Sequence, residues 1–158
     1  AVATIDNAIA VAVAIHDAIV IGNASAWHYW WLMNHSPDNQ GLLNQGGVKT
    51  KRLYSVGNYS KFVRPGFARI GTLGGPEGVV ASAFRDCAGR FALVVINKNP
   101  VSTPFGIAFK GAAAKSVTPW VTSSTLNLVA GAKLEVSAGR VETTLPASSV
   151  TTFVGAAP

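Results

Sequence analysis

Charged residues and cysteine are scarce in this sequence. Lys, Arg, Asp and Glu make up 13% of the 158 residues, about half of the roughly 25% found in an average soluble domain. Ser, Thr, Asn and Gly are therefore expected to form much of the surface, as in many secreted proteins. The single cysteine, Cys87, excludes an internal disulfide. It is compatible with either redox compartment, and no neighbouring base suggests thiol chemistry.

Long uninterrupted hydrophobic runs are also absent. The longest one, Ala8–Ile21, is interrupted by His16 and Asp17, and it is shorter than the ~20 apolar residues that span a bilayer. We therefore expect no membrane association. The first ten residues contain no Met, no basic segment and no cleavage pattern, so they are not a signal peptide in their own right. We expect a chain that was cut or processed from something longer.

Acidic residues are outnumbered by basic ones, and the formal net charge is +6. Six of the 13 basic residues lie between Lys49 and Arg69. Nucleic-acid binding would need these charges on one face, together with aromatic residues placed for stacking and a known motif. No such motif is present. We interpret the basic stretch as a solvated helix face and expect no nucleic-acid partner.

Aromatic residues, in contrast, are concentrated in one stretch, Ala24–Leu32. Three of the four tryptophans and one of the three tyrosines lie in five consecutive positions of this stretch, 27–31. Turn-forming residues stand on both sides, which is typical of a buried β-strand. In a strand, alternate residues point to opposite faces. Trp30 would then share one face with His28 and Leu32, and Trp31 would share the other with Trp27 and Tyr29.

Two amphipathic helices are predicted on either side of this stretch. The apolar residues of Ile5–Ile21 recur every three or four positions. Thr4 is placed to cap this helix and Gly22 to end it. Residues 33–48 form a loop, and Lys49–Val63 is a second helix, which Pro65 and Gly66 end. A helix, a short turn and an apolar strand are part of a parallel α/β unit, whose companion strands are not found upstream in this sequence.

After residue 65 the pattern changes to short strands separated by Gly and Pro turns. Eight such strands predict an antiparallel β-sandwich. The predicted strands are Phe67–Leu73, Val79–Arg85, Arg90–Asn97, Phe105–Lys110, Ser116–Val121, Lys133–Ser137, Arg140–Thr144 and Ser149–Val154. We therefore predict two units, residues 1–65 and residues 66–158.

Several runs in this order carry a resemblance to a known family. They are AWHYWWL, GLL, TKRLYSVGNYSKFVRPGFARI, VVASAFRD, FALVVIN, SVTPWVTSSTLNL and LPASSVTTFVG. With them the sequence resembles the C-terminal part of glycoside hydrolase family 30, which includes endo-xylanases, glucuronoxylanases, endo-β-1,6-galactanases and glucosylceramidase-like enzymes. Members have a (β/α)8 TIM barrel fused to a side β-sandwich. The resemblance covers nearly the whole chain.

The resemblance implies that residues 1–65 are a fragment of such a barrel. Ile5–Ile21 would be the seventh helix, Ala24–Leu32 the eighth strand and Lys49–Val63 the eighth helix. A complete barrel needs roughly 250 residues. The family's two catalytic carboxylates, about 5 Å apart in retaining enzymes, come from the fourth and seventh strands, upstream of Ala1. No acid of this chain matches them, so we expect no hydrolase activity from the chain alone.

The resemblance also suggests which residues would contact a polysaccharide substrate. The resemblance places Trp30 at the family's active-site tryptophan. An indole at that position can cover the apolar face of a pyranose ring. Tyr29 and Trp31 flank it, and Asn34 and His35 follow at the strand end. Glucuronoxylan-specific members typically carry an Arg-rich run there, whereas this chain has Met33-Asn34-His35. This difference argues against strict glucuronoxylan specificity and leaves neutral xylan or a β-1,6-galactan open.

Two other interpretations remain open at this point. The β-sandwich could be a non-catalytic carbohydrate-binding or stabilising module, or the chain could be a fragment with no function of its own. The expected partners are a polysaccharide and the missing N-terminal barrel portion. We expect no cofactor, and the spacing of His28, His35 and Asp38 does not favour a metal site. If the resemblance holds, the parent protein is secreted.

Overall fold

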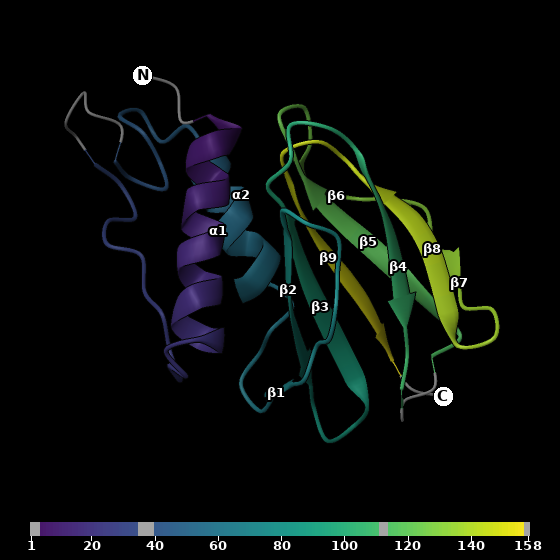
Figure 1. Cartoon of the computed structure of the whole chain (residues 1–158). Helices are drawn as coiled ribbons and strands as arrows, with labels where there is room; N and C mark the ends of the chain where they lie inside the picture. The colour runs from purple at the N-terminus through teal and green to yellow at the C-terminus, as the bar shows by residue number, and fades with distance from the viewer. Residues whose placement is uncertain (1–3, 35–39, 111–113, 157–158) are drawn as a thin grey trace.

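The computed structural model of the chain describes residues 4–34, 40–110 and 114–156. In this part of the chain, two helices pack on the outer face of the larger sheet of a β-sandwich (Figure 1). The helices are α1 (Ile5–Val20) and α2 (Lys51–Ser60). The strands are β1 (Ala68–Ile70), β2 (Val79–Arg85), β3 (Arg90–Asn97), β4 (Thr103–Ala108), β5 (Ser116–Thr122), β6 (Asn127–Ala130), β7 (Leu134–Glu135), β8 (Arg140–Leu145) and β9 (Ser149–Ala156).

The larger sheet runs in the order β1-β2-β3-β9-β5-β6, with β7 paired to the side of β5. The second sheet consists of β4 and β8, and every strand pair within the described residues is antiparallel. The C-terminal strand β9 lies between β3 and β5 in the middle of the larger sheet. The predicted β-sandwich is therefore confirmed, because alternating apolar residues and turn residues together specify short antiparallel strands.

The strand β6 was not predicted from the sequence. It covers four residues, only Leu128 among them is partly buried, and Leu128 has a left-handed φ of 54°. The pairing with β5 is also irregular between Val121 and Thr122. A short, mostly exposed strand with a bulge leaves no alternating pattern in the sequence.

Two hydrophobic cores occupy the two faces of the larger sheet. The first lies between the helices and the sheet and includes Ile9, Ala12, Tyr59, Phe84 and Val94. The second lies between the two sheets. It is built from buried residues of β3, β4, β5, β8 and β9, namely Val95, Phe105, Ile107, Val117, Val141, Leu145 and Phe153. The larger sheet is thus apolar on both faces, which explains the nearly continuous hydrophobic sequence of β3.

Helix α1 has the predicted bounds to within one residue, but its ends are made differently. Thr4 occupies the N-cap position without a side-chain hydrogen bond to the helix. At the other end Asn23 takes the left-handed conformation, with φ 50°. Asn is the residue other than glycine that most readily adopts this conformation after a helix. The expected capping bond of Thr4 is therefore absent, whereas the helix does end directly before Gly22, as predicted.

A buried polar network ties α2 to the larger sheet. The Asn58 side chain, fully buried, donates to the carbonyl of Trp120 (3.0 Å) and to Thr152 Oγ1 (3.0 Å). It accepts a hydrogen bond from Thr122 Oγ1 at 2.6 Å. At the start of the same helix Lys51 Nζ donates to the carbonyls of Ser123 and Leu126. The helix and the sheet therefore pack as one unit.

The prediction that Ala24–Leu32 is a buried β-strand is wrong for this structure. The segment has no strand conformation and follows the side of α1 that faces away from the sheet (Figure 1). A strand needs at least one neighbouring strand to pair its backbone N–H and C=O groups, and a buried strand needs one on each edge. In the described part of the chain, the only bridge near it is the parallel pair of Met33 with Leu43. Aromatic and β-branched content alone therefore did not produce a strand.

Candidate functional site

The aromatic segment, residues 24–34, divides into an anchored half and an exposed half. Trp27 packs against the core between the helices and the sheet. Tyr29 lies beside it, with ring centroids 6.0 Å apart. The Tyr29 hydroxyl donates a 2.7 Å hydrogen bond to the carbonyl of Gln40. These two rings therefore hold the segment against the body of the protein.

The exposed half is formed by Trp30 and Trp31. Trp30 is 67% exposed and Trp31 is 43% exposed. Their ring centroids are 4.7 Å apart, with an angle of 43° between the ring planes. The two indoles thus form one exposed aromatic pair, and they do not lie on opposite faces as the predicted strand required. The reason is the backbone at Trp31, whose φ of 135° breaks the alternation of an extended chain.

Of the remaining predicted site residues, the structure describes Asn34 but not His35. Asn34 is buried, with 7% of its surface exposed, and it lies where the segment meets Gly41. A Cβ atom on Gly41 would be only 2.8 Å from the backbone N of Asn34, so the two backbone segments are in close contact. His35 and Asp38 lie outside the described residues. Tyr29, Trp30, Trp31 and Asn34 are therefore brought together on one segment.

Backbone hydrogen bonds attach this segment to residues 41–43. The N–H of Leu42 donates to the carbonyl of Trp31 (3.2 Å), and the N–H of Leu43 donates to the carbonyl of Leu32 (2.8 Å). On its other side this stretch meets the start of α2, where the Thr50 N–H and hydroxyl both donate to the Leu42 carbonyl. This arrangement leaves no pattern in the sequence, because every acceptor in these bonds is a backbone carbonyl.

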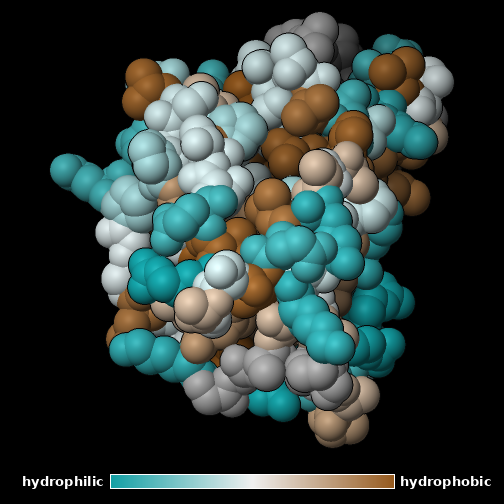
Figure 2. Space-filling model, turned by 90° about the vertical axis from the view of Figure 1, so that its right-hand side faces the viewer, coloured by the Kyte–Doolittle hydropathy of each residue, from teal (hydrophilic) through white to brown (hydrophobic). Residues whose placement is uncertain are grey.

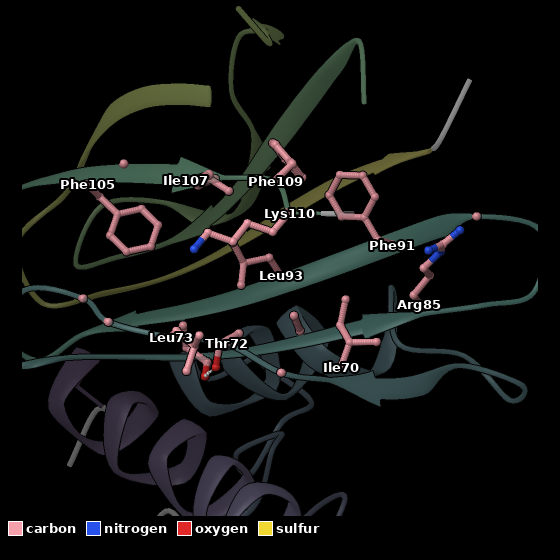
Figure 3. Close-up of a pocket in the computed structure, with 18 residues that line it drawn as sticks. Ile70, Thr72, Leu73, Arg85, Phe91, Leu93, Phe105, Ile107, Phe109 and Lys110 are labelled. Carbon is pink, nitrogen blue, oxygen red and sulfur yellow. Dashed lines mark hydrogen bonds between the residues drawn. The ribbon is translucent and has the colours of Figure 1, made fainter. Parts of the chain in front are cut away.

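A second feature, which the sequence analysis missed, is a pocket in the sandwich. It has a volume of about 360 Å³ and lies between β2, β3, β4 and the loop after β1 (Figure 3). Its aromatic lining comes from Phe91, Phe105 and Phe109, and its cations are Arg85 and Lys110. Viewed from the side of β4 and β8, hydrophobic residues lie among hydrophilic ones, several of them recessed (Figure 2). None of the predicted site residues lines this pocket.

Three acidic residues of the sandwich, Asp86, Glu135 and Glu142, pair with neighbouring cations. Asp86 Oδ2 accepts a 2.6 Å hydrogen bond from Arg90 Nε, and Asp86 Oδ1 accepts one from the Arg90 N–H. Desolvation opposes the charge of Asp86, but these bonds lower the pKa of its carboxyl. The other two pairs, Lys133 with Glu135 and Arg140 with Glu142, are exposed surface pairs at 3.4 Å. Glu135 and Glu142 therefore have the surroundings of surface ion pairs, whereas the Asp86 side chain is only 7% exposed.

Burial shifts the pKa of three further groups. It lowers the pKa of His16 in α1 and of Lys51 in α2, and it raises the pKa of Tyr59 to about 12. All three lie at the contact between the helices and the sheet rather than in the pocket or at the indole pair. Within the described ranges, no three His, Cys, Asp or Glu side chains are grouped as a metal site requires. Neither described helix is long and apolar enough to cross a membrane.

Comparison with known proteins identifies the domain family of the β-sandwich. Residues 68–153, from β1 to β9, match the model of the glycosyl hydrolase family 30 beta sandwich domain. The chain is 36% identical over 149 residues to the glucuronoxylanase XynC of Bacillus subtilis, and the matched part is 94% of this chain and 34% of that protein. XynC of strain 168 is 37% identical over 141 residues.

Solved structures agree with this match over the helices as well. A GH30 endoxylanase from Clostridium papyrosolvens C71 superposes with a TM-score of 0.89 at 35% identity, over 99% of this chain and 39% of its own. The family 30 subfamily 8 xylanase Xyn30A from Clostridium acetobutylicum gives a TM-score of 0.90 at 32% identity, over 98% and 40%. The chain therefore belongs to glycoside hydrolase family 30, as the sequence motifs predicted. It spans about a third of the length of the curated relatives that it matches.

Proposed function

We propose that this chain is the C-terminal part of a retaining endo-β-glycanase that acts on xylan. The observation that carries the proposal is the match of nearly the whole chain to xylanases of which it covers only 39 to 40%. In this proposal residues 1–65 are the end of a (β/α)8 barrel, and the rest of the barrel comes from the missing N-terminal portion. The parent protein is secreted, as hydrolysis of a cell-wall polysaccharide requires.

The exposed indole pair is the proposed contact with the sugar. Trp30 presents a flat apolar surface that can cover the C–H face of a pyranose ring, and Trp31 widens this surface. Once the barrel is complete, Asn34 and His35 are proposed to hydrogen-bond to sugar hydroxyls, with Tyr29 fixing the approach of the segment. The two carboxylates of the retaining mechanism are proposed to come from the missing portion. The chain alone is then inactive.

Zymography on three polysaccharides tests this proposal. The purified chain is expected to produce no clearing on glucuronoxylan, neutral xylan or a β-1,6-galactan. Co-expression with the upstream portion of the Bacillus subtilis glucuronoxylanase, which ends where the match begins, is expected to restore clearing on xylan. The matched control carries Trp30→Ala in this chain and should restore less clearing. Activity of the chain alone would contradict the assignment of the carboxylates, and clearing of the galactan alone would contradict xylan as substrate.

A second candidate function is a non-catalytic carbohydrate-binding module. The aromatic lining of the pocket favours it, because Phe91 and Phe109 are only partly buried and their rings lie 5.4 Å apart. Affinity electrophoresis in gels with embedded xylan tests this function. Binding through the pocket predicts retardation that Phe91→Ala abolishes and Trp30→Ala leaves unchanged. Migration without retardation would exclude the binding module and leave only a stabilising role for the sandwich.

A further inference from the structure

Residues 40–43 lie between the aromatic segment and the start of α2. On one side, the carbonyl of Gln40 accepts the hydrogen bond from the Tyr29 hydroxyl. The N–H groups of Leu42 and Leu43 donate to the carbonyls of Trp31 and Leu32, respectively. Gly41 has no space for a side chain, since a Cβ there would collide with the carbonyl oxygen of Leu43 and the N atom of Asn34. The position of residues 40–43 therefore fixes the position of the backbone that carries the indole pair.

The first turn of α2 holds residues 40–43 from the other side. Arg52 is a buried residue, 8% exposed, and its Nη2 donates a 3.0 Å hydrogen bond to the carbonyl of Gly41. Thr50 donates to the next carbonyl along, that of Leu42. Lys51, between them in sequence, reaches the opposite way and donates to the carbonyls of Ser123 and Leu126 and to Asn127 Oδ1. One helical turn thus joins the aromatic segment to the β5–β6 connection.

The charge of Arg52 is unusual at this place in a helix. The partial positive charge of a helix N-terminus favours acids in the first turn, yet α2 has no acid there and begins with Lys51 and Arg52. A buried cation is also costly unless hydrogen bonds compensate it. Helix formation alone therefore does not explain Arg52. The planar guanidinium can reach the Gly41 carbonyl while its stem packs inside the protein.

We propose that Arg52 is a positioning residue for the exposed indole pair. Its hydrogen bond to Gly41 holds residues 40–43 in the place where they fix Trp31 at φ 135° and keep Trp30 and Trp31 in contact. Lys51, in the same helical turn, bonds to the β5–β6 connection and takes no part in this positioning. The proposal rests on the proposed function, because the indole pair is the surface assigned there to the sugar.

The experiment measures the geometry of the pair in the full chain without any sugar. Two indoles in contact produce an exciton couplet in the far-ultraviolet circular dichroism spectrum. Arg52→Met keeps the apolar stem and removes the donors. This variant is expected to lose the couplet, and the amide hydrogens of Leu42 and Leu43 are expected to exchange about tenfold faster or more. Arg52→Lys keeps one donor and a charge, and it is expected to retain most of the couplet.

Lys51→Met is the matched control, since it alters the same helical turn on the side of the sandwich. It should accelerate exchange at residues 123–127 and leave the couplet unchanged. An unchanged couplet and unchanged Leu42 and Leu43 exchange in folded Arg52→Met would overturn the proposal. Equal loss of the couplet in Lys51→Met would also overturn it, because the effect would then belong to α2 as a whole. Since no sugar is present, failure of the xylan assignment leaves these results unaffected, and the two failures are distinguishable.

Discussion

His16 is the residue whose burial has the clearest consequence for stability. It lies in α1 with 8% of its surface exposed. Burial lowers the pKa of its imidazole below 6.5, Asp17 opposes this effect, and Lys98 adds to it. The neutral ring fits the interior, whereas the protonated ring does not. The buried position of His16 supports a packing role.

The pH dependence of unfolding tests this reading of His16. Above pH 6.5 the ring is neutral in both the folded and the unfolded state, so it costs no stability. As the pH falls below 6.5 the unfolded state binds a proton first, and the free energy of unfolding decreases until the folded-state pKa is passed. In His16→Gln this decrease should be reduced in urea titrations between pH 7.5 and about pH 5. The exposed-residue control His28→Gln should retain it. Equal slopes for wild type and His16→Gln would contradict the prediction.

At the scale of elements, α2 is attached to the sheet by polar contacts as much as by apolar ones. Asn58 makes two donor contacts and one acceptor contact with its amide, all to residues of β5 and β9. Thr152 Oγ1 also donates to the Asn58 carbonyl at 2.7 Å. Such a network is favourable only when every member is satisfied. Its loss should therefore leave polar groups without partners on both the helix and the sheet, and so lower the free energy of unfolding.

Replacement of Asn58 measures the strength of this attachment. Asn58→Ala should lower the free energy of unfolding by about 2 to 4 kcal/mol, because it leaves the Trp120 carbonyl and the Thr122 hydroxyl buried without their partner. Asn44→Ala is the control, since Asn44 caps an exposed turn through its bond to the Val48 N–H, and it should cost under about 1 kcal/mol. Urea denaturation measures both. A loss under about 1 kcal/mol for Asn58→Ala would show that the network contributes little.

The aromatic segment shows how an element depends on neighbours outside it. Its composition predicted a strand, and in the structure it is an irregular segment with two exposed indoles. The helices on either side formed, because a helix satisfies its own backbone hydrogen bonds, although α2 covers Lys51–Ser60 and is shorter than the predicted Lys49–Val63. A strand leaves all of its backbone groups to its neighbours. A prediction from the pattern of apolar residues was therefore correct for α1 and incorrect for residues 24–32.

For the whole molecule, the main feature is an apolar surface along residues 21–34 and 40–48. Its large exposed hydrophobic side chains are Ile21, Trp30, Trp31, Leu32, Met33 and Val48. Exposed apolar residues gathered on one segment are typical of contact sites rather than of ordinary surface. In the proposed function this surface faces the missing barrel portion and the sugar. In the chain by itself it is open to association with further copies.

Self-association of the chain is the expected result. Sedimentation should show a weight-average mass that rises with concentration, because burial of the apolar surface between copies is favourable. Leu32→Ser should reduce this rise, since Leu32 is 64% exposed on the segment. Val101→Ser is the control, because Val101 is similarly exposed at 63% but lies in the turn between β3 and β4. A strictly monomeric chain at all concentrations would contradict the prediction.

The sequence by itself determined the family, both helices and the β-sandwich. These features depend on local periodicity and turn residues, and an apolar run between turns such as Arg90–Asn97 has the same bounds in sequence and structure. Tertiary structure alone decided the contact of Trp30 with Trp31, the strand β6, the pocket and the roles of Arg52 and Asn58. The physical reason is that these features are made by backbone carbonyls and by residues far apart in the chain. Their contacts exist only once the helices have packed on the sheet.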